Sequence, residues 1–310
     1  MRFDRIIQYF NRLIMVQVIM NATLSIRRHM ILFKRFDQFN CVEKSNIGSE
    51  YYKKNGNIFF KVIFYISKSY WKYKYINNNF ALSFKRHIGK YQIIKKLGEG
   101  KCAICYYSRT TEGMPVVLKC TKKWWFFIDR KHLVETKILS KIDHPSIPKI
   151  VDIFNYENIE GFVMEYKPGN TIYKMVVDEK KCFSYNETVC LFKKVLLVVK
   201  YLHDNNIVHY DLKPDNIIVY NDNISLIDFG FSDYSRKNRN DYVYDYLHLG
   251  NLILFLLYSN YNGYTKGTWI EQLGLNKKQV IFIKKLLLIL EPQSSITEIQ
   301  LEFNSLFTIR

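Results

Sequence analysis

The feature that most constrains this 310-residue chain is the run HYDLKPDNI, followed shortly by SLIDFG. Asp211 is followed by Lys213 two residues on and by Asn216 three further on, and a second carboxylate, Asp228, comes after a segment of hairpin length. Phosphoryl transfer needs a group that orients a hydroxyl, a cation for the γ-phosphate and oxygen ligands for magnesium. These four residues are unlikely to occur in this order and spacing by chance, so the sequence predicts a phosphotransferase site.

Residues upstream fit the same chemistry. In LGEGKCAIC, Gly98 and Gly100 allow a strand to turn tightly and to bring backbone N–H groups against phosphate oxygens, although this pattern alone is weak. The strand PVVLK carries Lys119 among apolar residues, where an unpaired charge is costly. Lys119 therefore needs an acidic partner, and Glu135 in the helical stretch HLVETKIL is a suitable one.

The order of elements from residue 90 onward is strand-rich first and helix-rich later. A strand of partly alternating polarity starts at Tyr91, and a helical stretch is expected from about 129 to 142. Ser184 and Glu187 form a predicted capping box ahead of apolar residues at helical spacing. This order favours an α+β fold.

Taken together, these motifs resemble the eukaryotic-type serine/threonine protein kinases over about residues 90 to 310. The resemblance implies a bilobal, protein-kinase-like α+β fold, with a small β-rich N-lobe at about 90–164, a hinge at 165–169 and a larger, mostly helical C-lobe at 170–310. It leaves residues 1–89 as a basic N-terminal extension of unknown role.

The resemblance also implies a role for each matching position, with ATP and Mg²⁺ as the nucleotide and the metal. Asp211 matches the catalytic base and Lys213 the lysine typical of serine/threonine specificity, while Asn216 and Asp228 match the magnesium ligands. Lys119 would anchor the α- and β-phosphates. The ATP-binding positions implied in this way are Gly98, Gly100, Lys119, Glu135, Glu165 and Lys167.

Other positions match the family's framework. Met164 looks like the residue before the hinge, and the backbone from Glu165 to Lys167 would bond adenine. Asp245 resembles the buried aspartate at the start of a long central helix. The residues that fit the family's internal hydrophobic spine are Leu139, His209 and Phe229.

The match fails at several positions. Ala103 replaces the third loop glycine, Val117 replaces the alanine above adenine, and Tyr210 replaces an arginine that in many relatives receives an activation-loop phosphate. Only 16 residues separate Asp228 from Asp245, with no Ala-Pro-Glu motif between them. These 16 residues span at most about 50 to 60 Å, which leaves little for a peptide-docking shelf.

The loss of the Ala-Pro-Glu motif is accompanied by the loss of the arginine that usually pairs with its glutamate. Ser295 occupies the place where relatives usually carry the arginine that pairs with the missing glutamate. Removing one member of a buried ion pair costs several kcal/mol, whereas removing both can be nearly neutral. The paired loss favours a coherent, folded variant.

Three hypotheses about the function stay open. The first is a protein kinase that transfers the γ-phosphate of Mg-ATP to Ser/Thr hydroxyls of an unknown protein substrate, because the positions for the base, the cation and the metal are all filled. The second is a nucleotide-binding pseudokinase or scaffold. The third is a small-molecule kinase of kinase-like fold, which Lys213 and Pro214 disfavour.

The net charge of +18 is concentrated near the start, where the first 90 residues hold 17 Lys and Arg against 4 Asp and Glu. This basicity allows contact with an anionic surface, but it also suits a solvated face, and no specific nucleic-acid motif accompanies it. The apolar stretch 13–26 is too short for a transmembrane helix. Two alternatives stay open, namely a targeting or membrane-surface helix and an ordinary helix packed on the rest of the protein.

Cysteine usage bears on the compartment. Six cysteines in a chain of this length do not suggest a disulfide framework, so we expect a reducing compartment and a cytoplasmic protein. The CxxC of Cys102 and Cys105 lacks further ligands at zinc spacing, and coincidence is the better interpretation.

Overall fold

The computed structural model describes residues 86–100, 103–122, 129–156, 159–236, 241–261 and 268–309, although for 129–133 the backbone alone is described. All of them belong to one compact unit, which begins at Tyr75. The predictions for residues 1–85, including the stretch 13–26, and for Cys102 lie outside the described residues. The predicted domain boundaries stay predictions.

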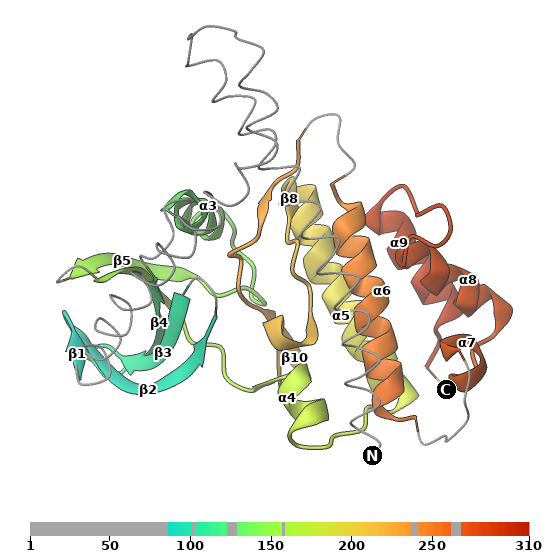
Figure 1. Cartoon of the computed structure of the whole chain (residues 1–310), viewed down its shortest axis with the longest axis horizontal. Helices are drawn as coiled ribbons and strands as arrows, with labels where there is room; N and C mark the ends of the chain where they lie inside the picture. The colour runs from blue at the N-terminus through green and yellow to red at the C-terminus, as the bar shows by residue number, and fades with distance from the viewer. Residues whose placement is uncertain are drawn as a thin grey trace, which may run out of the picture. The chain divides into compact units, whose positions relative to one another are not determined.

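The first part of this unit is a curled antiparallel sheet in the order β1-β2-β3-β4-β6-β5 (Figure 1). In β3 buried and partly exposed residues alternate, and Ile104 and Tyr106 are buried on one face, whereas β4 buries five consecutive residues, from Val116 to Cys120. The side chains of Ile104 and Tyr106 join a core that includes Leu118 and Val163. The strands are His87–Ile88 (β1), Tyr91–Glu99 (β2), Ala103–Arg109 (β3), Pro115–Thr121 (β4), Ile150–Tyr156 (β5) and Ile159–Glu165 (β6).

One helix, α3 (Asp129–Leu139), lies between β4 and β5 in the chain. The sequence predicted this helix to continue to about residue 142, but it ends three residues earlier. The Ser140 hydroxyl donates to the Thr136 carbonyl at 2.8 Å, and Lys141 N–H donates to the Ile138 carbonyl at 3.0 Å. The second of these bonds spans three residues instead of four, so it tightens the last turn before the loop that carries Pro145.

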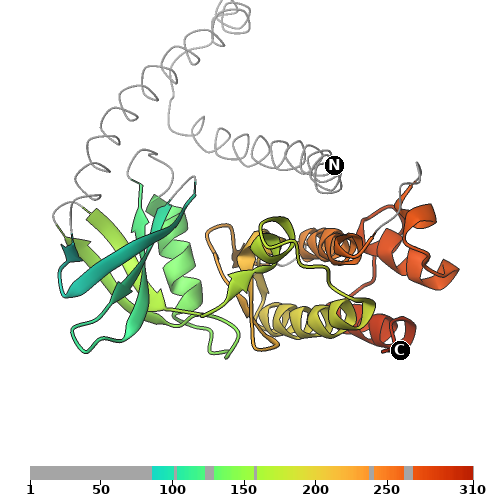
Figure 2. The ribbon, with the colours of Figure 1, turned by 90° about the horizontal axis from the view of Figure 1, so that it is seen from below.

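The second part is mostly helical, and Figure 2 shows it as a separate lobe beside the sheet. In α5 the predicted capping box is confirmed: the Ser184 hydroxyl accepts from Glu187 N–H, and the Glu187 side chain accepts from Ser184 N–H. Helices α5 and α6 pack along each other in the centre. The helices are Ile172–Val177 (α4), Tyr185–Asp204 (α5), Val243–Ser259 (α6), Trp269–Gln272 (α7), Lys277–Leu286 (α8) and Ile296–Leu306 (α9).

Short strands lie between the sheet and the helices. The hairpin of β9 and β10 turns at Asn221 and Asp222, which both have positive φ (45° and 62°), as a tight primed turn requires. Below it, Ile227 N–H donates to the Asn216 carbonyl at 2.9 Å, so the hairpin brings the segments around Asn216 and Asp228 together. The remaining elements are Asn170–Thr171 (β7), Ile207–Val208 (β8), Pro214–Asn216 (η1), Ile217–Tyr220 (β9), Asn223–Leu226 (β10) and Asp233–Tyr234 (β11).

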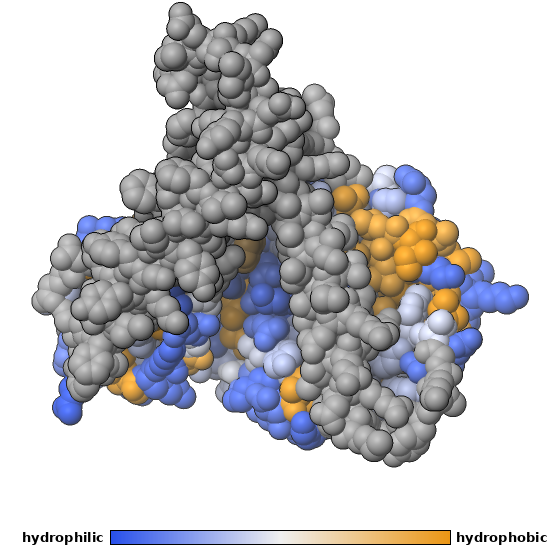
Figure 3. All heavy atoms as spheres, in the orientation of Figure 1, coloured by the Kyte–Doolittle hydropathy of each residue, from blue (hydrophilic) through white to orange (hydrophobic). Residues whose placement is uncertain are grey.

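The sheet lobe and the helical lobe confirm the predicted bilobal α+β fold. Apolar residues also gather on the surface over α8 and α9 (Figure 3), and this part of the chain contains Leu301, with 68% of its area exposed. Within the described ranges, every helix is too short or too polar to cross a membrane.

Candidate active site

Lys119 lies at the centre of a charge network that joins three segments. Its ammonium is 2.6 Å from a Glu135 carboxylate oxygen on α3 and 2.7 Å from Asp228, which follows β10. Burial alone would lower the pKa of Lys119, but the two carboxylates raise it above its ordinary value. Burial would likewise raise the pKa of Asp228, but the Lys119 ammonium lowers it to about 2. The pKa shifts of Lys119 and Asp228 thus both favour their charged forms, whereas burial raises the pKa of Glu135.

The loop after β8 brings three further predicted residues together. The Lys213 ammonium is 2.7 Å from the Asp211 carboxylate. The Asn216 side-chain amide donates to the carbonyl and to the carboxylate of Asp211, both at 2.9 Å. The carboxylate of Asp211 is thus oriented by a cation and an amide from its own loop.

The backbone of this loop is bonded to Asp245 in the first turn of α6. Asp245 is fully buried and accepts hydrogen bonds from the N–H groups of His209 at 3.0 Å and Tyr210 at 2.8 Å. Its third partner is the buried His203, whose Nε2 lies 2.9 Å away. Burial would raise the pKa of Asp245, but the hydrogen bond with His203 lowers it. Nothing in the sequence singled out His203 as a partner of Asp245.

Tyr210 adopts a left-handed conformation with φ of 62°, which is uncommon outside glycine and asparagine. The Asp245 bond to its N–H holds this conformation. Its ring lies 5.6 Å from the ring of Tyr244 on α6. An aromatic contact therefore stands where many kinases carry the arginine.

The residues matched to the hydrophobic spine are all buried. Leu139 ends α3, and the rings of His209 and Phe229 meet edge to face at 4.8 Å. Phe229 thereby links the segment of Asp228 to the loop of Asp211.

The glycine loop joins β2 to β3. Gly98 is the eighth residue of β2, and Gly100 N–H donates to the Ala103 carbonyl at 2.9 Å. A methyl group built on Gly98 would meet no heavy atom of the described structure within 4 Å, and one on Gly100 would meet only the Ala103 carbonyl, at 3.8 Å. Packing inside the described chain does not require glycine here, whereas close approach of a ligand would.

At the predicted hinge, the side chains of Glu165 and Lys167 are engaged with the protein. The Lys167 ammonium is 2.8 Å from the Glu165 carboxylate and 3.0 Å from the Pro145 carbonyl. Glu165 N–H donates to the Lys149 carbonyl at 2.9 Å. In contrast, the Lys167 backbone N–H has no hydrogen-bond partner among the described residues. A nucleotide base would thus meet backbone groups at the hinge.

The chemistry of Asn216 and Asp228 fits magnesium. The Asn216 amide nitrogen is used by Asp211, which leaves its carbonyl oxygen as the ligand atom. The Asp228 side chain is 43% exposed, and Lys119 and Gly230 N–H both contact its Oδ1. The described residues contain no cluster of three His, Cys, Asp or Glu ligands. Mg²⁺ bound with nucleotide phosphates needs only one or two protein oxygens, so the two residues suffice.

The short segment after Asp228 is anchored by β11, which pairs with β8. Ser295, in the place of the family's arginine, is the N-cap of α9, and its hydroxyl accepts from Glu298 N–H at 3.2 Å. Residue 295 therefore has a local structural role, stabilising the start of a helix.

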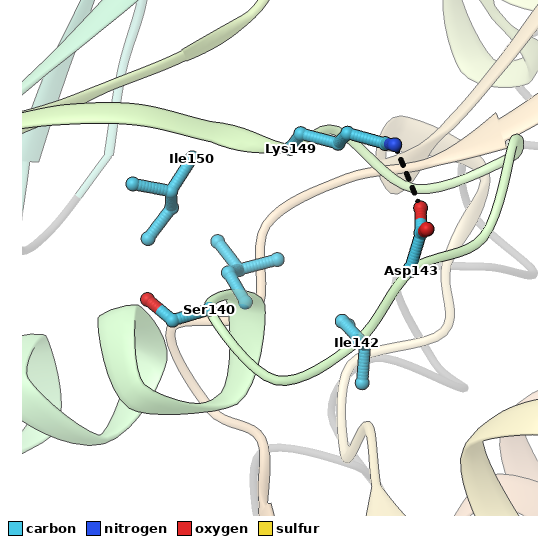
Figure 4. A pocket seen from close by; sticks show the side chains of 6 residues that line it. Ser140, Ile142, Asp143, Lys149 and Ile150 are labelled. Carbon is cyan, nitrogen blue, oxygen red and sulfur yellow. Dashed lines mark ion pairs between the residues drawn. The ribbon is translucent and has the colours of Figure 1, made fainter.

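A hollow of about 270 Å³ lies apart from these groups, between the end of α3 and the start of β5 (Figure 4). The Lys149 ammonium and the Asp143 carboxylate, 2.8 Å apart, bridge one side of it. Its lining includes Leu139 but none of the predicted catalytic, ATP-binding or metal-binding residues. It carries no part of the proposed chemistry.

Comparison with known proteins agrees with this geometry. Residues 91–268 match the model of the protein kinase domain family. A probable serine/threonine-protein kinase from Bacillus subtilis is 33% identical over 177 residues, which cover 55% of this chain and 69% of the relative. The carbon catabolite-derepressing protein kinase of Saccharomyces cerevisiae is 35% identical over 51% of this chain, but the match covers 25% of that protein. The chain therefore belongs to the protein kinase domain family, as a divergent member of its eukaryotic-type serine/threonine group.

Proposed function

We propose that this chain transfers the γ-phosphoryl group of Mg-ATP to serine or threonine hydroxyls of a protein substrate. The observation that carries the proposal is the pair of contacts from Lys119 to Glu135 and to Asp228, at 2.6 and 2.7 Å. Protein kinases act only when this lysine–glutamate pair and the metal-binding aspartate are in place together. The names of the relatives support the same activity.

The catalytic loop supplies the groups for the transfer step. Asp211 would accept a hydrogen bond from the substrate hydroxyl, orient its oxygen toward the γ-phosphorus and take its proton. The Lys213 ammonium, 2.7 Å from Asp211, is within reach of the charge that develops on the phosphoryl oxygens.

The sheet side supplies the groups for binding. Lys119, held by Glu135, would bind the α- and β-phosphates, while the backbone at Gly98 and Gly100 covers them. The N–H of Lys167 and the carbonyl of Glu165 would bond the adenine edge. Asn216 and Asp228 would hold Mg²⁺, and the ion would supply positive charge beside the phosphates.

The first experiment is ATP turnover by the purified full chain with Mg²⁺ and a generic basic protein, beside Asp228→Asn as the control. We expect phosphoserine or phosphothreonine that disappears in the control. ATP binding without transfer would overturn the proposal in favour of the second candidate, a nucleotide-binding pseudokinase. The short segment between Asp228 and Asp245 favours that candidate because it leaves little chain for a substrate shelf.

A small-molecule kinase is the third candidate. Phosphate transfer to a small alcohol or amine but to no protein would favour it.

Two further proposals rest on composition. A cytoplasmic location is proposed from cysteine usage, since the described cysteines Cys105, Cys120, Cys182 and Cys190 form no disulfide with one another. Contact with an anionic surface through the basic residues 1–90 follows from their charge. Salt-dependent binding of the full chain to anionic vesicles would test the second.

A further inference from the structure

A second lysine, Lys122, directly follows the last residue of β4 and lies against the glycine loop. Lys122 comes three residues after Lys119, and its side chain is only 8% exposed. Its ammonium donates to a carboxylate oxygen of Glu99, which stands between the two loop glycines. It also donates to the backbone carbonyl of Gly100 at 2.8 Å. Lys122 therefore bonds both a side chain and the backbone of the loop.

These contacts differ from an ordinary surface ion pair. An exposed pair is worth little, because water competes for both partners. A buried ammonium must be compensated by the groups around it, and here the loop supplies two of those groups, the Glu99 carboxylate and the Gly100 carbonyl. Lys96 of β2 contacts the other oxygen of Glu99 at 2.5 Å. Moving the loop away would separate Lys122 from the Gly100 carbonyl and from Glu99.

The position of the contact points to nucleotide binding. The Gly100 carbonyl belongs to the backbone that covers phosphates in the proposed function, and room is left beside Gly98. A loop that is already ordered loses less conformational entropy when a ligand binds. A bond that fixes the loop before binding should therefore raise affinity for the nucleotide and slow its release.

We propose that Lys122 is a positioning residue that holds the glycine loop over the phosphates of Mg-ATP, through Glu99 and the Gly100 carbonyl. The inference rests on the proposed function, since it assigns the loop to the nucleotide. Lys122 acts through the loop and forms no bond to the reacting atoms.

The test measures the Kd of the full chain for Mg-ATP and for Mg-ADP by displacement of a fluorescent nucleotide, which requires no turnover. Lys122→Met keeps the apolar stem and removes the ammonium, and Glu99→Gln keeps the loop side chain and removes its charge. We expect the Kd for both nucleotides to rise about five- to twentyfold in Lys122→Met, with a smaller rise in Glu99→Gln. The double variant should weaken binding by less than the product of the two single effects, because the residues share one contact.

Lys90→Met is the matched control. Lys90 also pairs with a carboxylate in the same sheet, Asp152 at 3.1 Å, but at the far end of β2. We expect its Kd for Mg-ATP to equal that of the wild type. Lys122→Arg should restore most of the affinity, since it returns a cation at the same place.

The outcomes separate the two proposals. If the wild type fails to bind Mg-ATP, the proposed function fails and this inference fails with it. If the wild type binds and Lys122→Met binds equally well, the role of Lys122 is overturned while the proposed function stands. A lower melting temperature with an unchanged Kd would mean a structural role only, and would equally overturn it.

Discussion

The sheet side of the candidate site and its catalytic loop are held by different kinds of contact. On the sheet side, Lys119, Glu135 and Asp228 come from three separate segments, and their charged side chains meet at the Lys119 ammonium. In the catalytic loop, the N–H groups of His209 and Tyr210 are bonded to one buried carboxylate, Asp245. One side depends on charges that a nucleotide could share, and the other on backbone geometry that a nucleotide does not touch.

This difference has a physical consequence. A side-chain ion pair can exchange one partner for a phosphate or a metal without refolding, because long side chains turn at small cost. A backbone N–H that loses its buried acceptor is left without any partner, which costs about 1 to 3 kcal/mol for each group. Binding should therefore be sensitive to changes on the sheet side, and folding to changes beneath the loop.

The largest effect should follow a change at the chemical step itself. Asp211→Asn keeps the shape of the side chain but removes the base, so we expect kcat to fall by about two to four orders of magnitude. The Kd for Mg-ATP should stay close to that of the wild type, because the contacts of Lys119 are untouched. Single-turnover kinetics with a titration of nucleotide would measure both. An unchanged kcat would remove Asp211 from its assigned role.

A matched pair of isosteric substitutions, one on each side of the site, tests whether the two sides differ in their contribution to stability. In Asp245→Asn an amide N–H₂ replaces an oxygen that accepts hydrogen bonds, so a buried N–H donor would face another donor. We expect a loss of about 2 to 4 kcal/mol in the free energy of unfolding. In Glu135→Gln, Lys119 keeps its bond to Asp228, and we expect a loss of about 1 kcal/mol.

Urea unfolding of the two variants and the wild type at one pH would measure this difference. Glu135→Gln should instead weaken Mg-ATP binding, because Lys119 is less well held. Equal losses of stability in the two variants would contradict the distinction between the two sides of the site.

The sequence reveals most where residues that act together lie close in the chain. Asp211, Lys213 and Asn216 fall within six residues, and the turn residues Asn221 and Asp222 mark the hairpin that leads to Asp228. The spacing alone therefore predicted a group of residues that the structure brings together. The α+β order could also be predicted, since alternation and helical spacing are local signals.

Contacts between distant segments could not be read in this way. Lys122 is one of three lysines in KCTKK, and only the path of the chain after β4 turns it toward Glu99. His203 lies on the buried stripe of α5, but its partner Asp245 is 42 residues away. Tyr210 looked like the simple loss of an arginine, whereas the structure places its ring beside Tyr244. Each of these contacts depends on the tertiary structure, for which one sequence carries no local signal.

The smallest predicted effect is the loss of folding stability at low pH. Beneath the loop, His248 is 5% exposed, and its Nδ1 is buried with no hydrogen-bond partner in the described ranges. Burial lowers its pKa. Asp245 and Asp211 oppose that shift, while His209 and Lys213 add to it. A histidine held neutral in the fold takes up its proton in the unfolded chain, so stability falls as the pH drops below about 6.5, by up to about 1.4 kcal/mol per pH unit.

His248→Gln removes the titration of this buried histidine, and His144→Gln is the comparison in the loop between α3 and β5, where the His144 ring lies 4.8 Å from the ring of Tyr201. The pKa of His144 is also lowered by burial, but its side chain is only half-buried. Between pH 7.5 and 5.5 we therefore expect the wild type to lose more free energy of unfolding than His248→Gln does, while His144→Gln should follow the wild type closely. Urea unfolding at the two pH values measures the losses. If His144→Gln protects against acid as well as His248→Gln does, burial of His248 beneath the loop is not what makes the fold sensitive to acid.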